Sequence, residues 1–396
     1  MALDHTEPEG RSSRFERHRR KMVFVLVLAS GLLTDFVFTR AFRWLRPDAP
    51  SGPAGFRVKS PLYHHGFTPL ASVERENWGP WISAYRINSL GFRDRTTRQL
   101  ELRSEKPRIL FIGDSFTEGV GVPYERTFVG LVDQALVPRG IEVLGAGVAS
   151  YSPIMYYRRV RHLLDEVGLE FDALVVYIDI GDIEDEVTYK LDAEGNVVSR
   201  PERRVRELSA DRRYEFRGFE RFQGLKQFLH RNSLVGWSLF GWLENRFRNR
   251  WHRAGLWTVD EGFFEAYGRE GLQRAEENMD RLLGDCRKHG VRLTLAVYPW
   301  PDQIRRGDRE SRQVVYWRQW AERNGAGFLD YFPRFVDPAR GREILKSEFI
   351  EGDIHWNEAG HRAIAEGFLE YFEKGSVLPE PAHERSHDPR VSVPPG

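Results

Sequence analysis

Residues 108–121, RILFIGDSFTEGVG, carry the strongest fold signal of the chain. An apolar run stops abruptly at Gly113, Asp114 and Ser115, and polar, turn-prone residues follow before the next helical pattern begins. A short apolar run of this kind is typical of a strand that is buried on both faces of a parallel sheet. Because ligands bind outside the carboxyl ends of such strands, Ser115 stands where chemistry is expected.

The same strand pattern recurs along the chain and alternates with amphipathic helical patterns. Buried strands separated by helices indicate an α/β protein whose parallel sheet is covered by helices. Strands are predicted at residues 108–112, 141–144, 173–178, 292–298 and 327–330, and helices at 127–136, 154–167, 272–289 and 312–324.

Composition excludes several classes of protein. The 396 residues are 41% hydrophobic, which is enough for a sizeable core. The formal net charge of +1 gives no global electrostatic case for a nucleic-acid partner. The single cysteine, Cys286, allows neither an internal disulfide nor a multi-cysteine zinc site. It lies in a helical pattern and is predicted to be a buried packing residue.

The N-terminus combines a basic cluster at residues 11–21 with the apolar run MVFVLVLASGLLTDFVF at 22–38, in which Asp35 lies near the far end. We expect residues 22–42 to form a single-pass transmembrane signal-anchor. The basic side is expected in the cytoplasm, with residues 1–21 as a cytoplasmic tail. The following chain would then lie on the periplasmic or extracellular side of the inner membrane. A cleaved signal peptide and a soluble amphipathic helix are the alternatives.

The rest of the chain divides by composition. Residues 45–106 form an irregular lead-in, predicted as short strands and turns packed on a main domain at 107–375. An Arg- and aromatic-rich insertion at 188–265 interrupts this domain, and residues 376–396 are predicted to be disordered. Arg and aromatic residues could stack single-stranded nucleic acid. The better interpretation is a set of amphipathic helices, with membrane-surface contact or a substrate lid as a further use. Its apolar residues at helical spacing are Leu225, Phe228, Leu229, Val235, Leu239 and Leu243.

The stretch 353–361, DIHWNEAGH, offers the base that a nucleophilic Ser115 would need. The first and last loops of a doubly wound sheet can meet at one edge. His355 could therefore take the Ser115 proton, while Asp353 fixes the imidazole tautomer. A metal site is the weaker alternative, because the next histidine, His361, is expected to point elsewhere. We expect neither a metal nor a cofactor.

GDSFTEG at 113–119, together with DIHWNEAGH, resembles the SGNH/GDSL hydrolase superfamily over residues 105–375. The resemblance implies a three-layer α/β/α fold with a flavodoxin-like parallel sheet, and ester hydrolase or O-acyltransferase activity. It also implies a Ser115 nucleophile, a His355 general base and Asp353 as the acid. The common family spacing is Asp-x-x-His, but the Asp-x-His-Trp pattern found here is similar to that of the alginate O-acetylation proteins, a membrane-anchored bacterial branch.

The resemblance further implies an oxyanion hole that begins with the backbone N–H of Ser115. The second family block falls on residues 145–150, GAGVAS, and places Ser150 where the family has glycine. The third block places Gly181 where the family has asparagine, so one amide donor is missing. Loss of such a donor can lower turnover on the order of 10²-fold. Substrate contacts are predicted for Asp114, Asp182, Trp300 and Asn357.

These features together predict a serine ester hydrolase that acts on O-acyl esters. Its expected partners are an acylated carbohydrate of the envelope or another ester substrate, and the membrane through the N-terminal helix, with no nucleic acid. An O-acetyltransferase that receives its acyl group from a separate membrane protein is one alternative. A non-catalytic carbohydrate-binding protein on a hydrolase scaffold is another, because Gly181 and the Asp353 spacing depart from the family pattern.

Overall fold

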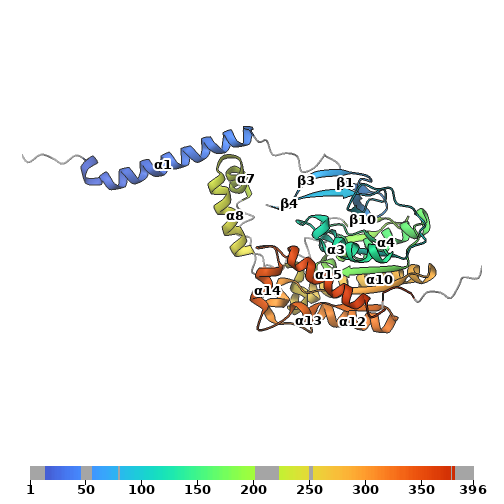
Figure 1. Ribbon diagram of the computed structural model, residues 1–396. Helices are drawn as coiled ribbons and strands as arrows, with labels where there is room; N and C mark the ends of the chain where they lie inside the picture. Colours follow the sequence, from blue (N-terminus) through green and yellow to red (C-terminus); the bar gives the residue numbers. More distant parts are fainter. Residues whose placement is uncertain are drawn as a thin grey trace, which may run out of the picture. The chain divides into compact units, whose positions relative to one another are not determined.

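The structure is a computed structural model that describes residues 14–45, 56–78, 81–200, 223–248, 253–375 and 377–379. The chain divides into two compact units, one within Met1–Ala49 and Glu215–Arg250 and the other within Pro50–Tyr214 and Trp251–Gly396. Figure 1 shows the elements of both units along the chain. The part of the predicted cytoplasmic tail before residue 14 and the predicted disordered tail beyond residue 379 lie outside the described residues.

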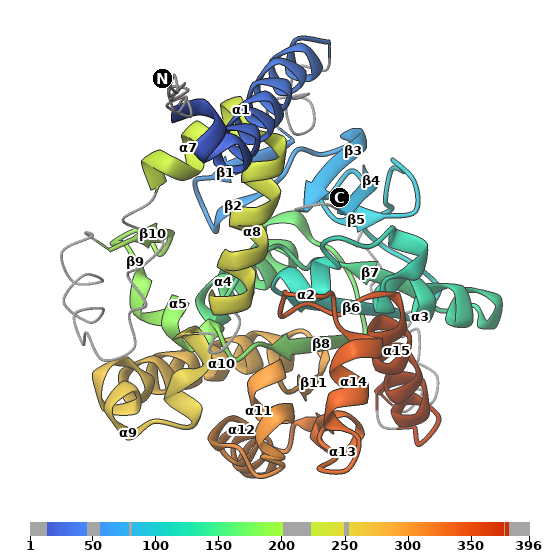
Figure 2. The same ribbon diagram turned by 90° about the vertical axis from the view of Figure 1, so that its left-hand side faces the viewer.

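The larger unit is built on an eight-stranded sheet in the order β12-β11-β8-β6-β7-β5-β4-β3. Figure 2 shows the strands from β11 to β3. Taken in chain order, its parallel strands follow the 2-1-3-4-5 arrangement of flavodoxin-like sheets. This arrangement confirms the predicted fold class and the predicted parallel strands. The parallel strands are β6 (Arg108–Gly113), β7 (Glu142–Gly145), β8 (Ala173–Ile178), β11 (Arg292–Val297) and β12 (Gly327–Asp330).

Helices cover both faces of the parallel strands. The right-handed crossover between β6 and β7 places α3 (Phe128–Leu136) on one face, where α15 (Glu358–Phe372) packs against it. The other face carries α4 (Pro153–Arg161), α10 (Arg269–Lys288) and α12 (Arg312–Asn324). α10 contacts α4, and Trp320 of α12 donates a hydrogen bond to Asp280 of α10 at 2.8 Å. The result is the expected three-layer arrangement.

The centre of the sheet is buried because both of its faces are covered. Every residue of β6 and of β8 is buried. Cys286 of α10 belongs to the same core, and its burial raises the pKa of the thiol to about 12. The prediction that Cys286 is a packing residue is confirmed.

The lead-in extends the sheet and does not only pack against it. β3 (Ser72–Trp78), β4 (Trp81–Ile87) and β5 (Arg93–Asp94) pair antiparallel with one another, and β5 joins β7 through Arg93 and Gly145. A separate hairpin joins β1 (Arg57–Ser60) and β2 (His64–Phe67). The predicted parallel sheet is therefore the main part of a mixed sheet, because the lead-in strands continue it beyond β7.

Short elements complete the described part of the larger unit. The hairpin of β9 (Tyr189–Leu191) and β10 (Val197–Ser199) lies inside the insertion that was predicted to be helical, so that prediction is too broad. Short 3-10 helices lie at Tyr124–Arg126, Val137–Arg139 and Arg253–Thr258, and short π-helices at His162–Val167 and Phe264–Gly268. The short helices are α2 (Ser115–Glu118), α5 (Asp182–Thr188), α9 (Glu261–Phe263), α11 (Pro301–Arg306), α13 (Phe332–Phe335) and α14 (Gly341–Glu348).

The smaller unit contains α1 (Arg14–Leu45), α7 (Gln223–Asn232) and α8 (Leu234–Arg248). The segment Lys21–Phe42 of α1 is long and apolar enough to cross a membrane, a property that a signal sequence shares. α7 and α8 contact α1 and each other. These two helices of the insertion therefore group with the N-terminal helix, whereas the sequence assigned the whole insertion to the sheet domain.

Candidate active site

Ser115 is presented by a tight turn between β6 and α2. Asp114 caps α2, with its Oδ1 accepting a hydrogen bond from the Phe116 N–H at 2.9 Å. A Cβ at Gly113 would lie 2.9 Å from the carbonyl oxygen of Tyr177, so the close approach of β6 and β8 requires glycine there. Gly119 ends α2 with φ of 75°. The turn leaves Ser115 at the carboxyl end of β6, 9% exposed.

Two predicted residues from the other end of the chain meet Ser115. The Ser115 Oγ lies 2.7 Å from His355 Nε2, and His355 Nδ1 lies 2.6 Å from Asp353 Oδ1. The three side chains thus form one hydrogen-bonded series in which the imidazole stands between a hydroxyl and a carboxylate. Such a series can move the hydroxyl proton to Nε2 while the carboxylate stabilises the imidazolium.

The short Asp-x-His spacing is accommodated by a turn of the backbone. Asp353 Oδ1 accepts hydrogen bonds from the N–H groups of Ile354 at 2.6 Å and His355 at 3.2 Å, as well as from the imidazole. Burial alone would raise the pKa of Asp353, but the hydrogen bond and charge of His355 and the two N–H groups lower it to about 2. Asp353 is therefore a carboxylate at neutral pH.

Aromatic rings hold the His355 imidazole in place. Phe116 lies 4.6 Å from it between ring centroids, and Trp78 of β3 meets it edge-on at 5.2 Å. Trp78 also donates its Nε1–H to Asp353 Oδ2 at 3.3 Å. Sequence reasoning missed Trp78, because its place beside the triad depends on the antiparallel strands. The one available signal was a tryptophan in a short lead-in strand pattern.

The oxyanion side is built around an unusual backbone conformation at Ser150. Its φ is +64°, in the left-handed region where the family has glycine. The backbone N–H groups of Ser115 and Ser150 have no acceptor within the part of the chain that the structure describes. Both are therefore available to a substrate oxygen. The backbone strain that the Cβ of Ser150 causes is tolerated because hydrogen bonds of its neighbours, Ala149 and Tyr151, fix the loop.

Gly181 does not contribute a donor, which corrects its predicted place in the oxyanion hole. Its N–H is donated to Asp179 Oδ1 at 2.6 Å. A Cβ at position 181 would lie 2.8 Å from this oxygen and 3.3 Å from the Trp300 ring. Asp179 and Trp300 therefore fill the space into which an asparagine side chain would extend.

Three of the four predicted substrate contacts are parts of the framework. Trp300 is 4% exposed and donates its Nε1–H to Asp179 at 2.6 Å. Asp182 is buried and accepts hydrogen bonds from the Tyr156 hydroxyl and the Asp179 N–H. Asn357 caps α15, with its side chain bonded to four backbone groups. These polar atoms are used inside the protein, so the predictions are corrected.

Asp114, the fourth predicted contact, touches Ser115 and belongs to a buried acidic cluster. Its Oδ2 lies 3.2 Å from Ser115 Oγ. Its carboxylate is close enough to those of Asp179 and Asp182 for the three to hold a metal ion by spacing. Burial raises the pKa of all three, and mutual repulsion raises those of Asp114 and Asp182 further. Their oxygens already accept protein hydrogen bonds, including those from Tyr298 and Trp300.

His361, the remaining candidate for a metal ligand, has a structural role. It is buried, and its Nδ1 accepts a hydrogen bond from the Phe128 N–H at 3.2 Å. Burial lowers its pKa to about 3, so the ring is neutral. It supports the start of α3.

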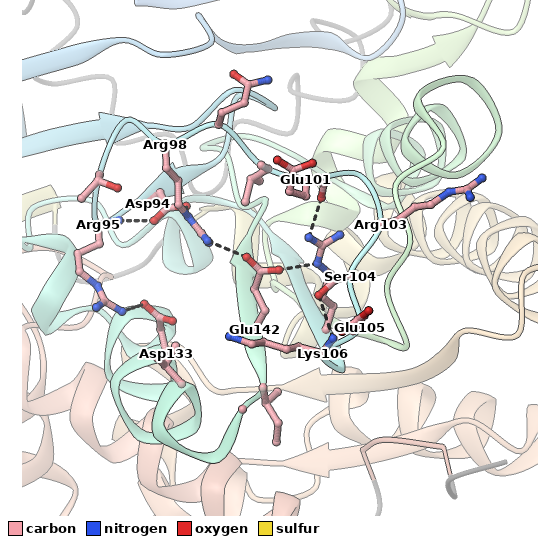
Figure 3. A pocket seen from close by; sticks show the side chains of 17 residues that line it. Asp94, Arg95, Arg98, Glu101, Arg103, Ser104, Glu105, Lys106, Asp133 and Glu142 are labelled. Atoms are coloured by element: carbon pink, nitrogen blue, oxygen red, sulfur yellow. Dashed lines mark hydrogen bonds and ion pairs between the residues drawn. The ribbon is translucent and has the colours of Figure 1, made fainter. Parts of the chain in front are cut away.

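A cavity of about 610 Å³ lies at the amino ends of strands β6 and β7 (Figure 3), whereas Ser115 lies at the carboxyl end of β6. Its lining includes Arg108, at the start of β6, and Glu142, at the start of β7. Arg108 and Arg98 both pair with Glu142, and Arg95 pairs with Asp133. Arg98 also pairs with Asp94, so three arginines meet three carboxylates. The cavity is an ion-paired surface, separate from Ser115.

A mostly parallel sheet covered on both faces, with a serine and a histidine meeting at the carboxyl ends of its strands, defines an α/β protein of hydrolase type. The sequence identifies the family. Residues 111–363 match the GDSL-like lipase/acylhydrolase family, and the chain belongs to that family. The matched stretch contains Ser115, Asp353 and His355.

Three similar solved structures match this chain over almost their whole length. A lipolytic protein of the G-D-S-L family from Desulfitobacterium hafniense shares 13% identity over 66% of this chain and 98% of its own, with a TM-score of 0.37. An acetylxylan esterase from Geobacillus stearothermophilus shares 15% identity over 68% of this chain and 95% of its own, with a TM-score of 0.36. An esterase from Pseudoalteromonas shares 11% identity over 68% of this chain and 97% of its own, with a TM-score of 0.37. At such identities a shared substrate does not follow. No curated protein sequence matches the chain.

Proposed function

We propose that this chain is a serine ester hydrolase that acts on O-acyl esters of envelope or extracellular carbohydrate through Ser115, His355 and Asp353. The observation that carries the proposal is the 2.7 Å contact between Ser115 Oγ and His355 Nε2, backed by the 2.6 Å contact between His355 Nδ1 and Asp353. A nucleophile, a base and a group that orients the base are the minimum for acyl transfer.

The proposed reaction has two steps at one site. Ser115 Oγ attacks the ester carbonyl while its proton moves to His355 Nε2, and the oxyanion accepts hydrogen bonds from the N–H groups of Ser115 and Ser150. The alcohol leaves with the proton from His355, and an acyl-serine remains. Water then attacks the acyl-serine with His355 again as base, which releases the carboxylic acid and restores Ser115.

The proposed carbohydrate substrate follows from the proposed location. Basic residues precede the apolar helix. This pattern favours an N-terminal end in the cytoplasm and a following domain on the periplasmic or extracellular side of the inner membrane. An O-acylated carbohydrate of the envelope would be reached from that side. Protease treatment of spheroplasts tests the location: we expect the domain to be digested, and protection of the full-length chain would contradict it.

A serine-reactive fluorophosphonate tests the chemistry directly. The purified chain should become labelled on Ser115 and should hydrolyse an aryl acetate, whereas Ser115→Ala should do neither. Ser347→Ala, a change at an exposed serine on α14, is the matched control and should behave like the native chain. A folded native chain that is neither labelled nor active would favour a carbohydrate-binding protein.

The Asp-x-His-Trp pattern favours a second candidate, in which a sugar hydroxyl in place of water accepts the acyl group. Acetate release and acyl transfer should be measured with and without a polysaccharide acceptor. Hydrolysis that does not depend on acceptor supports the esterase. Product that forms only with the acceptor and an acyl-donor membrane protein would identify a transferase.

A further inference from the structure

The smaller unit contains a charged residue inside its most apolar helix. Asp35 lies in the Lys21–Phe42 segment of α1, where its carboxylate accepts hydrogen bonds from the Ser233 hydroxyl and, at 3.2 Å, from the Val235 N–H. Thr39, one turn further on, is fully buried and accepts a hydrogen bond from the Leu234 N–H at 2.9 Å. Side chains of α1 thus cap the start of α8.

This contact satisfies groups on both helices that a membrane would otherwise penalise. The first N–H groups of a helix have no partner within the helix, and a carboxylate without a partner is costly in hydrocarbon. Thr39 and Asp35 accept hydrogen bonds from the first two N–H groups of α8. Ser233 Oγ accepts one from the third, that of Gly236, at 2.8 Å. The start of α8 is therefore fixed at the depth of Asp35 on α1.

Four apolar residues of α7 and α8 are exposed. Leu225 is 44%, Phe228 58%, Val235 68% and Leu239 56% exposed. The first ten residues of α8, LVGWSLFGWL, contain no charge, and charged residues follow only at its end. The exposed leucines, valines and phenylalanines of α1 are of the same kind. Exposed apolar residues grouped on one unit mark an interaction site.

We propose that α7 and α8 lie in the same membrane as α1, with Leu225, Phe228, Val235 and Leu239 against phospholipid acyl chains. The occupant is lipid because this surface continues that of a helix with the length and composition of a membrane span. At 15 residues, α8 is too short to cross a bilayer, which takes about 20. It therefore enters the membrane only part of the way, with its uncharged first ten residues among the acyl chains and its charged end in the headgroups.

The test places an environment-sensitive dye on the full chain in phosphatidylcholine–phosphatidylglycerol vesicles. Val235→Cys and Leu239→Cys carry the dye, and Glu322→Cys, at an exposed position of α12, is the control. The native Cys286 is buried and should not be labelled. We expect blue-shifted emission and about twofold quenching by acyl-chain spin labels at 235 and 239 only. Water-like emission there, or blue-shifted emission without lipid quenching together with cross-linking to a second copy or another protein, would overturn the proposal.

Substitution of Asp35 connects the dye signal to the cap. Asp35→Leu removes the acceptor and should return the dye at 239 toward water-like emission, while Asp35→Asn keeps an acceptor and should preserve the lipid signal. An unchanged signal in Asp35→Leu would contradict the role of the cap. Ester hydrolysis by the larger unit serves as the measure that each variant is folded, and it should not change.

A second inference rests on the proposed function and concerns the peptide between Ala149 and Ser150. The N–H of this peptide is the one that Ser150 would offer to an oxyanion. Its carbonyl, on Ala149, lies 2.8 Å from His65 Nε2, and the Ala149 N–H is donated to Glu118 Oε2 at 2.7 Å. Because C=O and N–H of a trans peptide point in opposite directions, a bond that holds the carbonyl also aims the N–H.

The tautomers of two neighbouring histidines are fixed by this bond. If His65 Nε2 donates to Ala149, its Nδ1 must accept from His64 Nδ1, 2.8 Å away, and His64 Nε2 then accepts from Ser199 Oγ at 3.1 Å. Burial lowers the pKa of both rings, which supports these neutral forms. The Tyr151 hydroxyl donates to the His65 carbonyl at 2.6 Å and ties the same loop to β2.

We infer that His65 is a positioning residue, which keeps the Ser150 N–H directed at the acyl oxygen although φ at Ser150 is unfavourable. His65→Ala should lower kcat by about 10- to 100-fold with little change in KM. His65→Gln, whose amide can donate the same bond, should retain most of the rate. Thermal unfolding of both variants controls for a general loss of structure.

The outcomes separate this inference from the proposed function. If the native chain is inactive, the proposed function fails; if it is active and His65→Ala matches it, only the inference fails. An increase of KM at constant kcat would make His65 a substrate contact, and equal losses in His65→Ala and His65→Gln would leave no role for the donated bond. Either result overturns the positioning role.

Discussion

The two loops that would act on an acyl group from different sides are built in different ways. The loop of His355 is held mainly by its own turn, because Asp353 accepts hydrogen bonds from the imidazole and from two N–H groups of that turn, and Trp78 adds one bond from β3. The loop of Ser150 is held by His65 and Glu118, which are distant in sequence. The base is therefore a local construction, whereas the oxyanion side depends on long-range packing and should respond to substitutions far from Ser115.

The largest effect is expected at the local loop, from His355→Ala. Removal of the base leaves a hydroxyl that is not activated, and we expect kcat to fall by roughly 10⁴-fold or more. His162→Ala, at a histidine paired with Glu166 away from the site, is the matched control. Steady-state hydrolysis of an aryl acetate measures both. Substantial activity in His355→Ala would remove the base assignment.

Asp353→Asn should have the next largest effect, a fall in kcat of about 10²- to 10⁴-fold, because an amide disfavours the productive tautomer. The pH dependence of stability gives a second measure. The pKa of Asp353 is lowered from 3.8 to about 2, so its contribution, about 2 kcal/mol at most, is present above pH 3.8 and disappears as pH falls through 2. Urea unfolding of both chains at pH 2 and pH 6 should show a difference that is small at pH 2 and larger at pH 6. A constant difference would contradict the ionised, hydrogen-bonded Asp353.

Trp78→Phe sharpens the comparison, because it tests whether the local loop also depends on the lead-in. The substitution keeps an aromatic ring beside His355 and removes the N–H donated to Asp353. Loss of one hydrogen bond to a carboxylate corresponds to about a 5- to 10-fold lower kcat. Trp81→Phe, at the start of β4, is the control. Equal activity of Trp78→Phe and the native chain would show that the loop needs no help from β3.

Ser150→Gly should have the smallest effect. Glycine relieves the left-handed strain but adds freedom to the unfolded chain, so the free energy of unfolding should change by less than about 1 kcal/mol. We expect kcat to stay within about twofold, because the N–H is kept. Ser150→Val, which is branched at Cβ, should lose both stability and rate. If Ser150→Val were as active as Ser150→Gly, the backbone conformation at 150 would not matter for the reaction.

Local patterns predicted the local half of this comparison. The apolar strand before Ser115 and the polar loop before α15 show the fold class directly, because buried parallel strands and amphipathic helices have distinct periodicities. The meeting of Ser115 and His355 followed from the topology of a doubly wound sheet. The substrate roles given to Trp300 and Asn357 were wrong, because a sequence does not show which polar atoms the protein itself will use.

The long-range half could not be predicted in the same way. Strand β5 is only two residues long, and its pairing with β7 is visible only once the sheet is assembled. Trp78 and His65 take their places through that assembly. The grouping of α7 and α8 with α1 likewise depends on Asp35, which the sequence showed only as a charge near the end of an apolar run.

The antiparallel extension determines where this protein can be shortened. A recombinant chain begun at residue 107 would contain all of the family match, yet it would leave β7 as an open edge, and open edges invite aggregation. It would also lose Arg93, whose guanidinium bonds to the carbonyls of Glu118, Gly119 and Val122 behind the nucleophile turn. A recombinant chain that starts before residue 56 retains both the sheet extension and Arg93, and should stay active, although α7 and α8 would lose their contacts with α1.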